Sequence, residues 1–346
     1  MHITEITTSV EKIPLKTPFI TALRRVENVE FIRVKILFNS GEFAYGEAPA
    51  TQAITGETLE TIEDSIKEIA PQLIGIQTDE ALDRVHQTSM GSSAKAALDI
   101  ALCETLCNLK VVDDSPLQSD VTISLGSVEK MLDDAETAFK EGMDILKVKL
   151  GKDISHAIEV TKVLSSQLPE AKLLIDANQA WSYEESLRYI TETSEIKLEL
   201  IEQPVVAKDR VSLKNLRKVS HTPIMADEAA FTLEDVKELI KLEAVDMINI
   251  KLMKCGGVSK AIEILEYARE HKIACMLGSM LEGPYSINAA LKLAFVYRDV
   301  IEYIDLDSPL LYKEQSPEVM CDIEGATFRL KEDLRTFGDK SKPDKS

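Results

Sequence analysis

Residues 145–150 read ILKVKL, a short apolar run that carries two lysines, Lys147 and Lys149. Runs of the same kind follow, and each ends in ionisable side chains: KLLID at Asp176, LELIE at Glu202, TPIMAD at Asp227, MINIK at Lys251, and EYIDLD with Asp305 and Asp307. The first five run ends, 149, 176, 202, 227 and 251, lie 27, 26, 25 and 24 residues apart. Strand-length runs at this spacing are typical of successive β-α units in a parallel sheet.

The repeat predicts a barrel. With VTISL, which starts at Val121, and ACMLG at 274–278, eight strand candidates lie between Val121 and Asp307. The predicted fold class is therefore α/β, with a TIM-type (β/α)8 barrel. In such a barrel the C-terminal ends of the strands converge on one face, so the strand-end side chains are expected to meet in an active site.

The rest of the chain predicts a second, smaller domain. Residues 1–50 alternate apolar and polar positions around a turn at 39–41, which indicates antiparallel strands, and residues 57–110 have helical spacing. We therefore expect an α+β capping domain at 1–117, the barrel at 118–308, and a C-terminal segment at 309–346 that returns to the capping domain. The length of 346 residues fits this division, because a barrel alone occupies about 250.

Composition excludes several classes of partner. The formal charge of −19 argues against nucleic acid and anionic membranes, because most of the surface repels phosphate. No apolar run approaches the ~18 residues that span a bilayer. The five cysteines are scattered, and the N-terminal MHITEITTSV lacks the basic and apolar regions of a signal peptide. We therefore expect a cytoplasmic protein with a small-molecule substrate. Its oligomeric state is open, and a homo-oligomer is one alternative.

Three acids, Asp176, Glu202 and Asp227, end three consecutive strand candidates. Crowded carboxylates without a cation would have strongly raised pKa values, so a divalent ion is the natural counter-charge. All-oxygen ligands without a nearby histidine or cysteine pair favour Mg²⁺. The alternative is that each acid caps the helix that follows it. Asn178 and Gln203, just beyond two of the acids, are expected to orient these ligands or to bond loop backbone.

The lysines indicate proton transfer. Lys147 and Lys149 are two residues apart on one strand, so both side chains point into the barrel. A lysine acts as a base when its pKa falls towards neutrality, and a neighbouring ammonium and a metal ion both lower it. We expect Lys149 to transfer a proton, and Lys147 to tune it or to bind a substrate oxygen. Lys251 ends the sixth strand candidate, across the barrel from the second, so two bases would face one carbon and invert it. Lys254 is the alternative to Lys251.

Taken together, these motifs resemble the enolase superfamily, specifically its muconate-lactonizing subgroup. The resemblance covers nearly the whole chain through GEAP at 46–49, LKVK at 146–149, DANQ at 176–179, EQP at 202–204, ADE at 226–228 and NIKL at 249–252. It implies a modified (β/α)7β barrel with a capping domain, lysine bases and Mg²⁺ as the cofactor.

Within that subgroup, Asp305-Leu306-Asp307 resembles the Asp-x-Asp motif of dipeptide epimerases, whose acids hold the substrate's α-ammonium. An ammonium carries three donors and needs anionic acceptors, which fits two carboxylates. The alternative is a pair of strand-end acids that form a cap or a salt bridge.

The resemblance also implies other contacts with the substrate. A mobile loop of the first domain that contains Phe19, Thr21, Arg24 and 54–56 would close over the site. Arg24 would contact a glutamyl carboxylate, or would be an ordinary exposed arginine. Ser279 and Met280 would lie beside the substrate. The segment LEGPY at 281–285 lacks the lysine or threonine that relatives often have, which leaves the C-terminal substrate residue open.

The implied function is Mg²⁺-dependent epimerisation of a dipeptide, with Ala-Glu as the leading candidate. Lys149 and Lys251 would exchange a proton at the Cα of the C-terminal residue, through an enediolate that the metal stabilises. Alternatives with the same intermediate are o-succinylbenzoate synthase, muconate cycloisomerase and N-acylamino acid racemase, whose substrates lack the ammonium. A metal-binding scaffold without activity is the non-enzymatic alternative.

Overall fold

Eight parallel strands form the barrel, as the repeat predicted. The computed structural model describes residues 1–20, 25–107, 109–111 and 113–331. The strands lie in the order β12-β11-β10-β9-β8-β7-β6-β5, so neighbours in sequence are neighbours in the sheet. Their bounds are β5 (Val121–Ile123), β6 (Ile145–Lys149), β7 (Lys172–Asp176), β8 (Leu200–Glu202), β9 (Ile224–Ala226), β10 (Met247–Lys251), β11 (Ala274–Gly278) and β12 (Ile301–Asp305).

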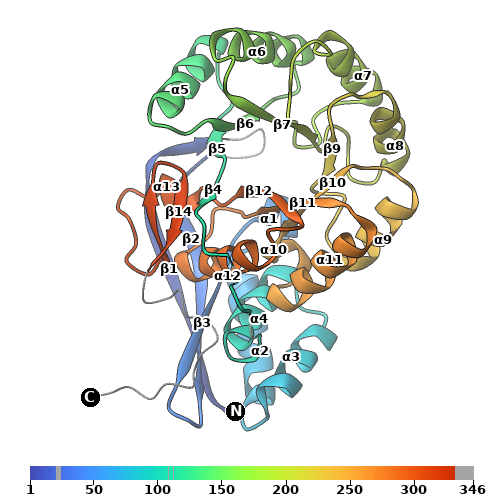
Figure 1. Ribbon diagram of the computed structural model, residues 1–346. Helices are drawn as coiled ribbons and strands as arrows, with labels where there is room; N and C mark the ends of the chain where they lie inside the picture. Colours follow the sequence, from blue (N-terminus) through green and yellow to red (C-terminus); the bar gives the residue numbers. More distant parts are fainter. Residues whose placement is uncertain (21–24, 108, 112, 332–346) are drawn as a thin grey trace.

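Helices connect each barrel strand to the next and surround the strands (Figure 1). They are α5 (Val128–Lys140), α6 (Ile154–Gln167), α7 (Tyr183–Glu192), α8 (Arg210–Val219), α9 (Leu233–Lys241), α10 (Leu252–Cys255), α11 (Val258–His271) and α12 (Pro284–Val296). Several begin with the side-chain caps that their sequences favour. The Ser182 hydroxyl, for example, accepts from the Glu185 N–H, and the Glu185 carboxylate accepts from the Ser182 N–H. The connectivity is the (β/α)7β pattern.

The ring closes between β5 and β12 through a short seam. Ser119 and Ile304 form a parallel bridge. The Asp120 N–H donates to the Ile304 carbonyl (3.0 Å), as does the Ser119 hydroxyl (3.2 Å), which also accepts from the Leu306 N–H (3.0 Å). The seam therefore depends on a side chain as well as on backbone pairing.

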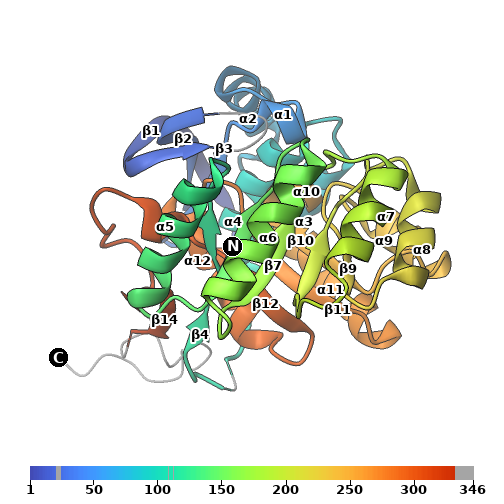
Figure 2. The ribbon, with the colours of Figure 1, turned by 90° about the horizontal axis from the view of Figure 1, so that it is seen from above.

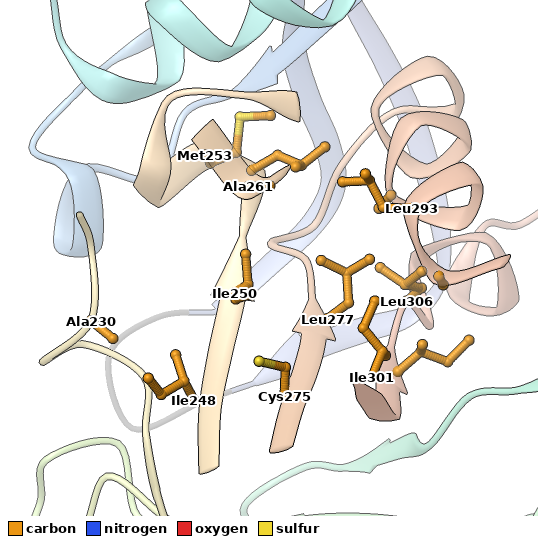
Figure 3. Packing of buried hydrophobic residues seen from close by; sticks show 14 of the residues in the cluster. Ala230, Ile248, Ile250, Met253, Ala261, Cys275, Leu277, Leu293, Ile301 and Leu306 are labelled. Atoms are coloured by element: carbon orange, nitrogen blue, oxygen red, sulfur yellow. The ribbon is translucent and has the colours of Figure 1, made fainter. Parts of the chain in front are cut away.

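Side chains alternate between the two faces of the strands. Outward residues such as Ile248, Ile250, Cys275 and Leu277 belong to the large apolar core, and Figure 3 shows Leu277 on the side of its strand that faces Leu293. A separate apolar layer consists of Ile145, Leu174, Leu200, Met225, Met247 and Met276. These residues have the opposite parity on their strands, so they fill the lower interior of the barrel. Two positions further along the same strands, the interior becomes polar.

The first domain is a three-stranded antiparallel sheet covered by helices, as predicted. The sheet has the order β1 (Ile3–Ile20), β2 (Arg25–Phe38), β3 (Phe43–Pro49). It is followed by α1 (Gln52–Thr55), α2 (Leu59–Leu73), α3 (Thr78–Gln87) and α4 (Ser92–Leu106). Helix α4 packs so closely on β3 that a Cβ on Gly46 would lie 1.9 Å from the Ala97 carbonyl oxygen. Only glycine fits there.

Helix α1 lies over the mouth of the barrel. It overlaps the centre of the barrel in Figure 1 and lies above the barrel helices in Figure 2. Residues 54–56 were expected in a loop, but Ile54 and Thr55 belong to α1, and Gly56 ends this helix with a φ of 77°. Thr21 and Arg24 lie outside the described residues.

The described part of the C-terminal segment contacts the first domain. After α13 (Ser308–Leu311), β13 (Cys321–Glu324) and β14 (Thr327–Leu330) form a small sheet with β4 (Leu117–Gln118). The Lys313 N–H donates to the Pro14 carbonyl (2.8 Å), and Glu318 pairs with Arg33 (2.8 Å). The domain bounds 1–117, 118–308 and 309–346 stay a prediction. Among the described helices, none has the length and apolar character needed to cross a bilayer.

Candidate active site

A pocket lies between the barrel mouth and the first domain. The first domain contributes Phe19 from β1 and residues on and beside α1. The barrel contributes strand-end residues, most of them ionisable. The lining residues are Phe19, Thr51, Ala53, Ile54, Thr122, Lys149, Asn178, Asp227, Glu228, Lys251, Ser279, Met280, Leu281, Asp305 and Asp307. The structure therefore brings together strand ends that are more than 180 residues apart in the sequence, from Thr122 to Asp307.

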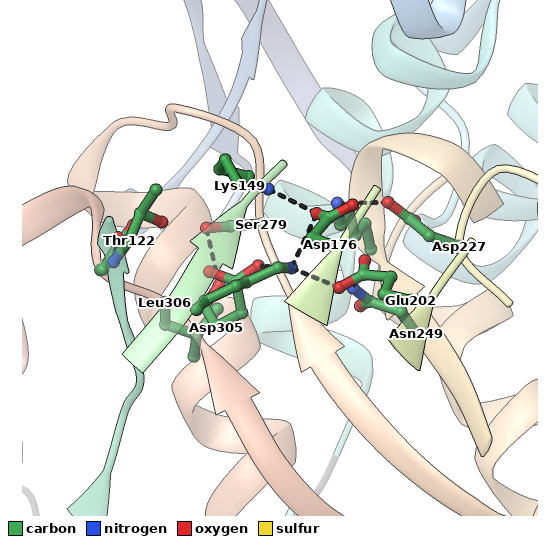
Figure 4. A network of polar contacts seen from close by, with 12 residues as sticks. Thr122, Lys149, Asp176, Glu202, Asp227, Asn249, Ser279, Asp305 and Leu306 are labelled. Carbon is green, nitrogen blue, oxygen red and sulfur yellow. Dashed lines mark hydrogen bonds and ion pairs between the residues drawn. The ribbon is translucent and has the colours of Figure 1, made fainter. Parts of the chain in front are cut away.

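The three acids predicted to bind metal lie next to one another (Figure 4). Asp176 ends β7 and pairs in register with Glu202, which ends β8, and Asp227 directly follows β9. All three are buried. Glu202 accepts from the Asn249 side-chain amide (2.9 Å). Burial and the neighbouring Asp176 carboxylate raise the pKa of Glu202 to about 7. This carboxylate lacks full compensation by positive charge.

Lys147 is completely buried below the pocket. Its ammonium lies 2.6 Å from Asp305, 2.7 Å from Glu202 and 3.6 Å from Asp176. Burial opposes its charge, but these carboxylates outweigh burial and raise its pKa well above the ordinary value. Lys147 is absent from the pocket lining. Its ammonium group lies between the acids of β7 and β8 and the acid of β12, and it does not face the pocket.

Lys149 and Lys251 both line the pocket and each pairs with an acid. Lys149 donates to Asp176 (2.6 Å), and Lys251 donates to Asp227 (2.8 Å). Burial lowers the pKa of Lys251, but Asp227 outweighs burial and the net pKa is raised. The raised pKa of Lys251 differs from the lowered pKa expected of a base. It is raised because Lys251 contacts the Asp227 carboxylate, which would otherwise be free to bind a metal ion.

Lys254, the alternative base, has a different environment. It is buried, is absent from the pocket lining, and donates to the Asp227 carboxylate and to the carbonyls of Asp227 (2.6 Å) and Asn249 (2.9 Å). All three N–H groups of its ammonium are thus used. Lys254 holds Asp227 in place, and Lys251 is the lysine of this pair that faces the pocket.

Asp305 and Asp307 lie at the barrel seam, beside Ser279 and Met280. Burial opposes the charge of Asp305, but Lys147 and Lys149 outweigh burial and lower its pKa to about 2. Asp307 accepts from the Thr122 N–H (3.0 Å), while burial and Asp305 raise its pKa to about 6. Ser279 donates to the Asp305 carbonyl through its N–H (2.9 Å) and its hydroxyl (3.2 Å).

Asn178 and Gln203 lie where the sequence predicted, in tight left-handed turns after β7 and β8, with φ of 44° and 36°. The Asn178 N–H donates to Asp176 (2.9 Å). The Gln203 side-chain oxygen accepts from the N–H groups of Asp227 and Ala229 (3.0 Å each). Each residue thus fixes the backbone or carboxylate of an acid predicted to bind metal.

The oxygen donors of the acid cluster suit Mg²⁺, although in this structure lysine side chains pair with the acids. Within the described ranges, no three His, Cys, Asp or Glu side chains are arranged so that they could hold an ion. The carboxylate oxygens of Asp176 and Asp227 are instead paired with the ammonium groups of Lys149, Lys251 and Lys254. Both oxygens of the neighbouring Glu228 are buried without a hydrogen-bond partner among the described residues. Buried oxygen donors that lack compensation are the ligand set of a hard cation.

Three features of the site were missed by the sequence analysis. Glu228 lines the pocket, and burial and Asp227 raise its pKa to about 8. Asp120 is a buried acid at the seam. A Cβ on Gly278 would lie 2.6 Å from the Asn249 amide oxygen and 3.0 Å from the Lys251 Cε, so this glycine makes room for the lysine. Glu228 follows the predicted strand end at Asp227, and this position was the available signal for it; Asp120 precedes a predicted strand, where strand-end convergence gives no signal.

Comparisons with known proteins agree with this geometry. The family described as "Enolase C-terminal domain-like" matches residues 130–333. The L-amino acid-D/L-Glu epimerase of Sulfurimonas denitrificans is 51% identical over 339 residues, which are 95% of this chain and 99% of that protein.

Two solved structures are similar along nearly their whole length. One is a substrate-liganded complex of the L-Ala-D/L-Glu epimerase from Bacillus subtilis, with a TM-score of 0.91 at 36% identity over 96% of this chain and 97% of that chain. The other is the dipeptide epimerase of Enterococcus faecalis complexed with Mg and L-Leu-L-Tyr, with a TM-score of 0.90 at 31% identity over 98% and 99%. The resemblance seen in the sequence is confirmed: the chain belongs to the enolase superfamily, within the family of the dipeptide epimerases.

Proposed function

We propose that the protein is a Mg²⁺-dependent dipeptide epimerase that inverts the Cα of the C-terminal residue. One observation carries the proposal: Lys149 and Lys251 line the same pocket from strands β6 and β10. In a ring of eight strands these two are four positions apart, which places them across the barrel from each other. The names of the similar proteins, which are epimerases of dipeptides, support the same reaction.

The two lysines divide the proton transfer between them. One amine removes the Cα proton from one face of the substrate, and the ammonium on the opposite face returns a proton. The reverse reaction exchanges the roles. Because each lysine serves one configuration, the pair inverts the stereocentre in both directions.

Asp176, Glu202 and Asp227 would hold the metal ion. When bound, Mg²⁺ would neutralise the charge that develops on the substrate's terminal carboxylate after deprotonation. Coordination would also withdraw Asp176 and Asp227 from Lys149 and Lys251. Lys251 would then lose the neighbour that raises its pKa, which favours the neutral amine needed for a base. Asn178 and Gln203 would keep the acids oriented.

The substrate is a dipeptide with a free α-ammonium. Asp305 and Asp307 supply buried anionic acceptors at the pocket wall, and an unpaired cation there would be stabilised by both. Substrates of o-succinylbenzoate synthase, muconate cycloisomerase or N-acylamino acid racemase have no ammonium. Two buried acids would then face a neutral or anionic group, which costs free energy.

Ala-Glu is the leading candidate substrate. The name of the Sulfurimonas denitrificans relative, L-amino acid-D/L-Glu epimerase, supports glutamate as the C-terminal residue and a broader choice at the first residue. In this chain, Ser279 and Met280 would lie beside the first residue, next to the ammonium. Phe19 and Ile54 would cover the substrate and exclude water. The proposed contact between Arg24 and the glutamyl carboxylate remains a prediction outside the described residues.

A deuterium-incorporation screen tests the proposal. The protein with Mg²⁺ is incubated in D₂O with a library of L,L- and L,D-dipeptides, and mass spectrometry detects exchange at Cα. We expect incorporation into dipeptides with a C-terminal glutamate, loss of it on addition of EDTA, and recovery with Mg²⁺. N-acetylated copies of the same dipeptides serve as controls and should exchange at least about tenfold more slowly. Exchange in the acetylated set alone would reject the dipeptide substrate.

A further inference from the structure

Asp120 is a buried acid for which the proposed reaction has no use. It precedes β5 at the barrel seam, and only 1% of the residue is exposed. Its N–H is bonded to the carbonyl of Ile304, the residue before Asp305. Within the described part of the chain, no donor group bonds to either of its side-chain oxygens. A buried carboxylate without a partner is costly, so this residue calls for an explanation.

The charged groups that face Asp120 are Asp305, Asp307 and Lys147. Lys147 is already engaged, at 2.6 Å from Asp305 and 2.7 Å from Glu202. The one ammonium that faces Asp120 is therefore already engaged by Asp305 and Glu202. Burial, and then the charge of Asp305, raise the pKa of Asp120 well above its ordinary value. These surroundings favour the protonated form of Asp120 over the ionised one.

A neutral carboxyl can donate a hydrogen bond, whereas an ionised one only accepts. The adjacent Asp305 remains ionised, because Lys147 and Lys149 stabilise its charge. A protonated Asp120 would therefore be a donor with a charged acceptor, Asp305, beside it. Such a pair is stronger than one between two neutral groups, because the acceptor is charged.

The neighbouring strands hold the end of β12, where Asp305 lies, unequally on its two sides. On one side β12 pairs with β11 over four residue pairs, which end at Gly278 and Asp305. On the other side, β12 meets the start of β5 through the short seam of the Ser119–Ile304 bridge and the hydrogen bonds of Ser119 and Asp120. A carboxylate that must receive a substrate group at a fixed position is held by neighbouring side chains. Lys147 contacts Asp305 from β6, and Asp120 is the neighbour on the seam side.

We propose that Asp120 is a positioning residue: its carboxyl group donates a hydrogen bond to Asp305 and, together with Lys147, holds that carboxylate in the orientation that receives the substrate's ammonium. The inference rests on the proposed function, because it assigns Asp120 to the ammonium end of the same pocket. It predicts that the carboxyl can be replaced by another neutral donor, but not by a methyl group.

Kinetics of three variants test this role. In Asp120→Asn the amide still donates, so KM for the dipeptide should stay within about threefold of the original value. In Asp120→Ala the donor is lost, and KM should rise about tenfold or more with a smaller change in kcat, as for a lost hydrogen bond to a charged group. Ser119→Ala is the matched control: it removes the seam hydroxyl and keeps the carboxyl, so KM should stay within about threefold.

Three kinetic outcomes would overturn the proposal. An Asn variant as damaged as the Ala variant would mean that the charge of Asp120 is used. An unchanged KM in Asp120→Ala would mean that the side chain supports nothing at the ammonium site. A KM in Ser119→Ala as high as in Asp120→Ala would assign the effect to the seam alone.

A measurement without substrate keeps the proposal separate from the proposed function. In protein labelled with ¹³C at aspartate carboxyl groups, the resonances of Asp120 and Asp305 are assigned by their loss in Asp120→Asn and Asp305→Asn. At pH 7 we expect Asp120 at the shift of a protonated carboxyl. The Asp305 resonance should keep its position in Asp120→Asn and move in Asp120→Ala. An ionised Asp120, or an Asp305 resonance that ignores both variants, would overturn the inference. If no dipeptide were epimerised, the proposed function alone would fail.

Discussion

The interior of the barrel consists of two layers that share the same strands and differ in chemistry. Leu200 and Glu202 lie two residues apart on β8, and both side chains point inward. Leu200 belongs to the apolar lower layer, and Glu202 lies in a polar upper layer with Lys147 and Asp176. Neither layer is exposed to solvent.

The difference separates stability from chemistry. The lower layer removes apolar surface from water, which stabilises the fold without a directional requirement. The upper layer buries carboxylates and ammonium groups, whose mutual attraction at best offsets the cost of removing them from water. The upper layer is therefore retained for what it does to a substrate. Substitutions in the two layers should affect different observables.

The largest effect is expected from Glu202→Gln in the upper layer. The amide keeps the shape of the side chain and removes a charge predicted to bind the metal, so epimerisation should fall about 10³-fold. The free energy of unfolding should change by less than about 1 kcal/mol, because the pKa of Glu202 is already raised to about 7. Deuterium exchange and urea unfolding measure the two quantities. If Glu202→Gln lost stability as well as activity, the two layers would not differ in what they contribute.

Leu200→Ala should have the opposite pattern. Removing a buried leucine leaves a cavity and should lower the free energy of unfolding by about 3 kcal/mol. Because Leu200 contacts the site only through the strand, kcat per folded molecule should stay within about threefold. Thermal unfolding, with activity measured well below the midpoint, checks both. A loss of kcat as large as that of Glu202→Gln would contradict the separation.

Buried acids outside the barrel interior provide a further comparison. Glu47 on β3 is buried and accepts from Arg33 (2.8 Å) and from the N–H groups of Tyr285 (2.8 Å) and Ser286 (3.2 Å), which join the first domain to α12. Its role is structural, although burial raises its pKa to about 7 in spite of Arg33. The same physical cause thus acts on a structural acid and on Glu202.

The pH dependence of stability should report on Glu47. Between pH ~4.5 and ~7 the folded chain binds the proton more tightly than the unfolded chain, so stability should fall as the pH rises through this window and should level off above it. We expect Glu47 to account for about 3 kcal/mol of this fall. Urea unfolding at pH 5, 6, 7 and 8 would measure it, and Glu47→Gln should have a smaller slope. Equal slopes for the two proteins would assign the pH dependence to other acids.

A smaller effect is expected from Asp305→Asn, in the upper layer at the seam. The amide cannot neutralise an ammonium, so kcat/KM for a free dipeptide should fall about tenfold. The rate with the N-acetylated dipeptide should change by less than about twofold, because that substrate carries no cation. Equal losses with both substrates would show that Asp305 supports the site without reading the ammonium.

Much of the architecture could be predicted because it depends on local patterns. The alternation of short apolar runs with helical stretches predicted all eight barrel strands, and the residue that ends each run marked the polar layer. Lys147, Lys149 and Asp176 needed only the two-residue period of a strand and the convergence of strand ends.

Other features depend on contacts that no local pattern encodes. The first barrel strand was predicted to start at Val121, yet Ser119 and Asp120 close the barrel against Ile304, 185 and 184 positions away in sequence. The position of Lys254 beside Asp227 depends on the short helix α10, which follows β10 directly. Packing in three dimensions decides that Lys251 lines the pocket and that Lys254 does not.

The central claim is that Lys149 and Lys251 serve opposite faces of one carbon. Exchange of the Cα proton for deuterium is therefore measured with each pure epimer of Ala-Glu in Lys149→Met and in Lys251→Met, with Mg²⁺ present. Each variant should lose net epimerisation and should exchange only one epimer, and the two variants should retain opposite epimers. Exchange of both epimers by either variant, or of the same epimer by both, would contradict the account.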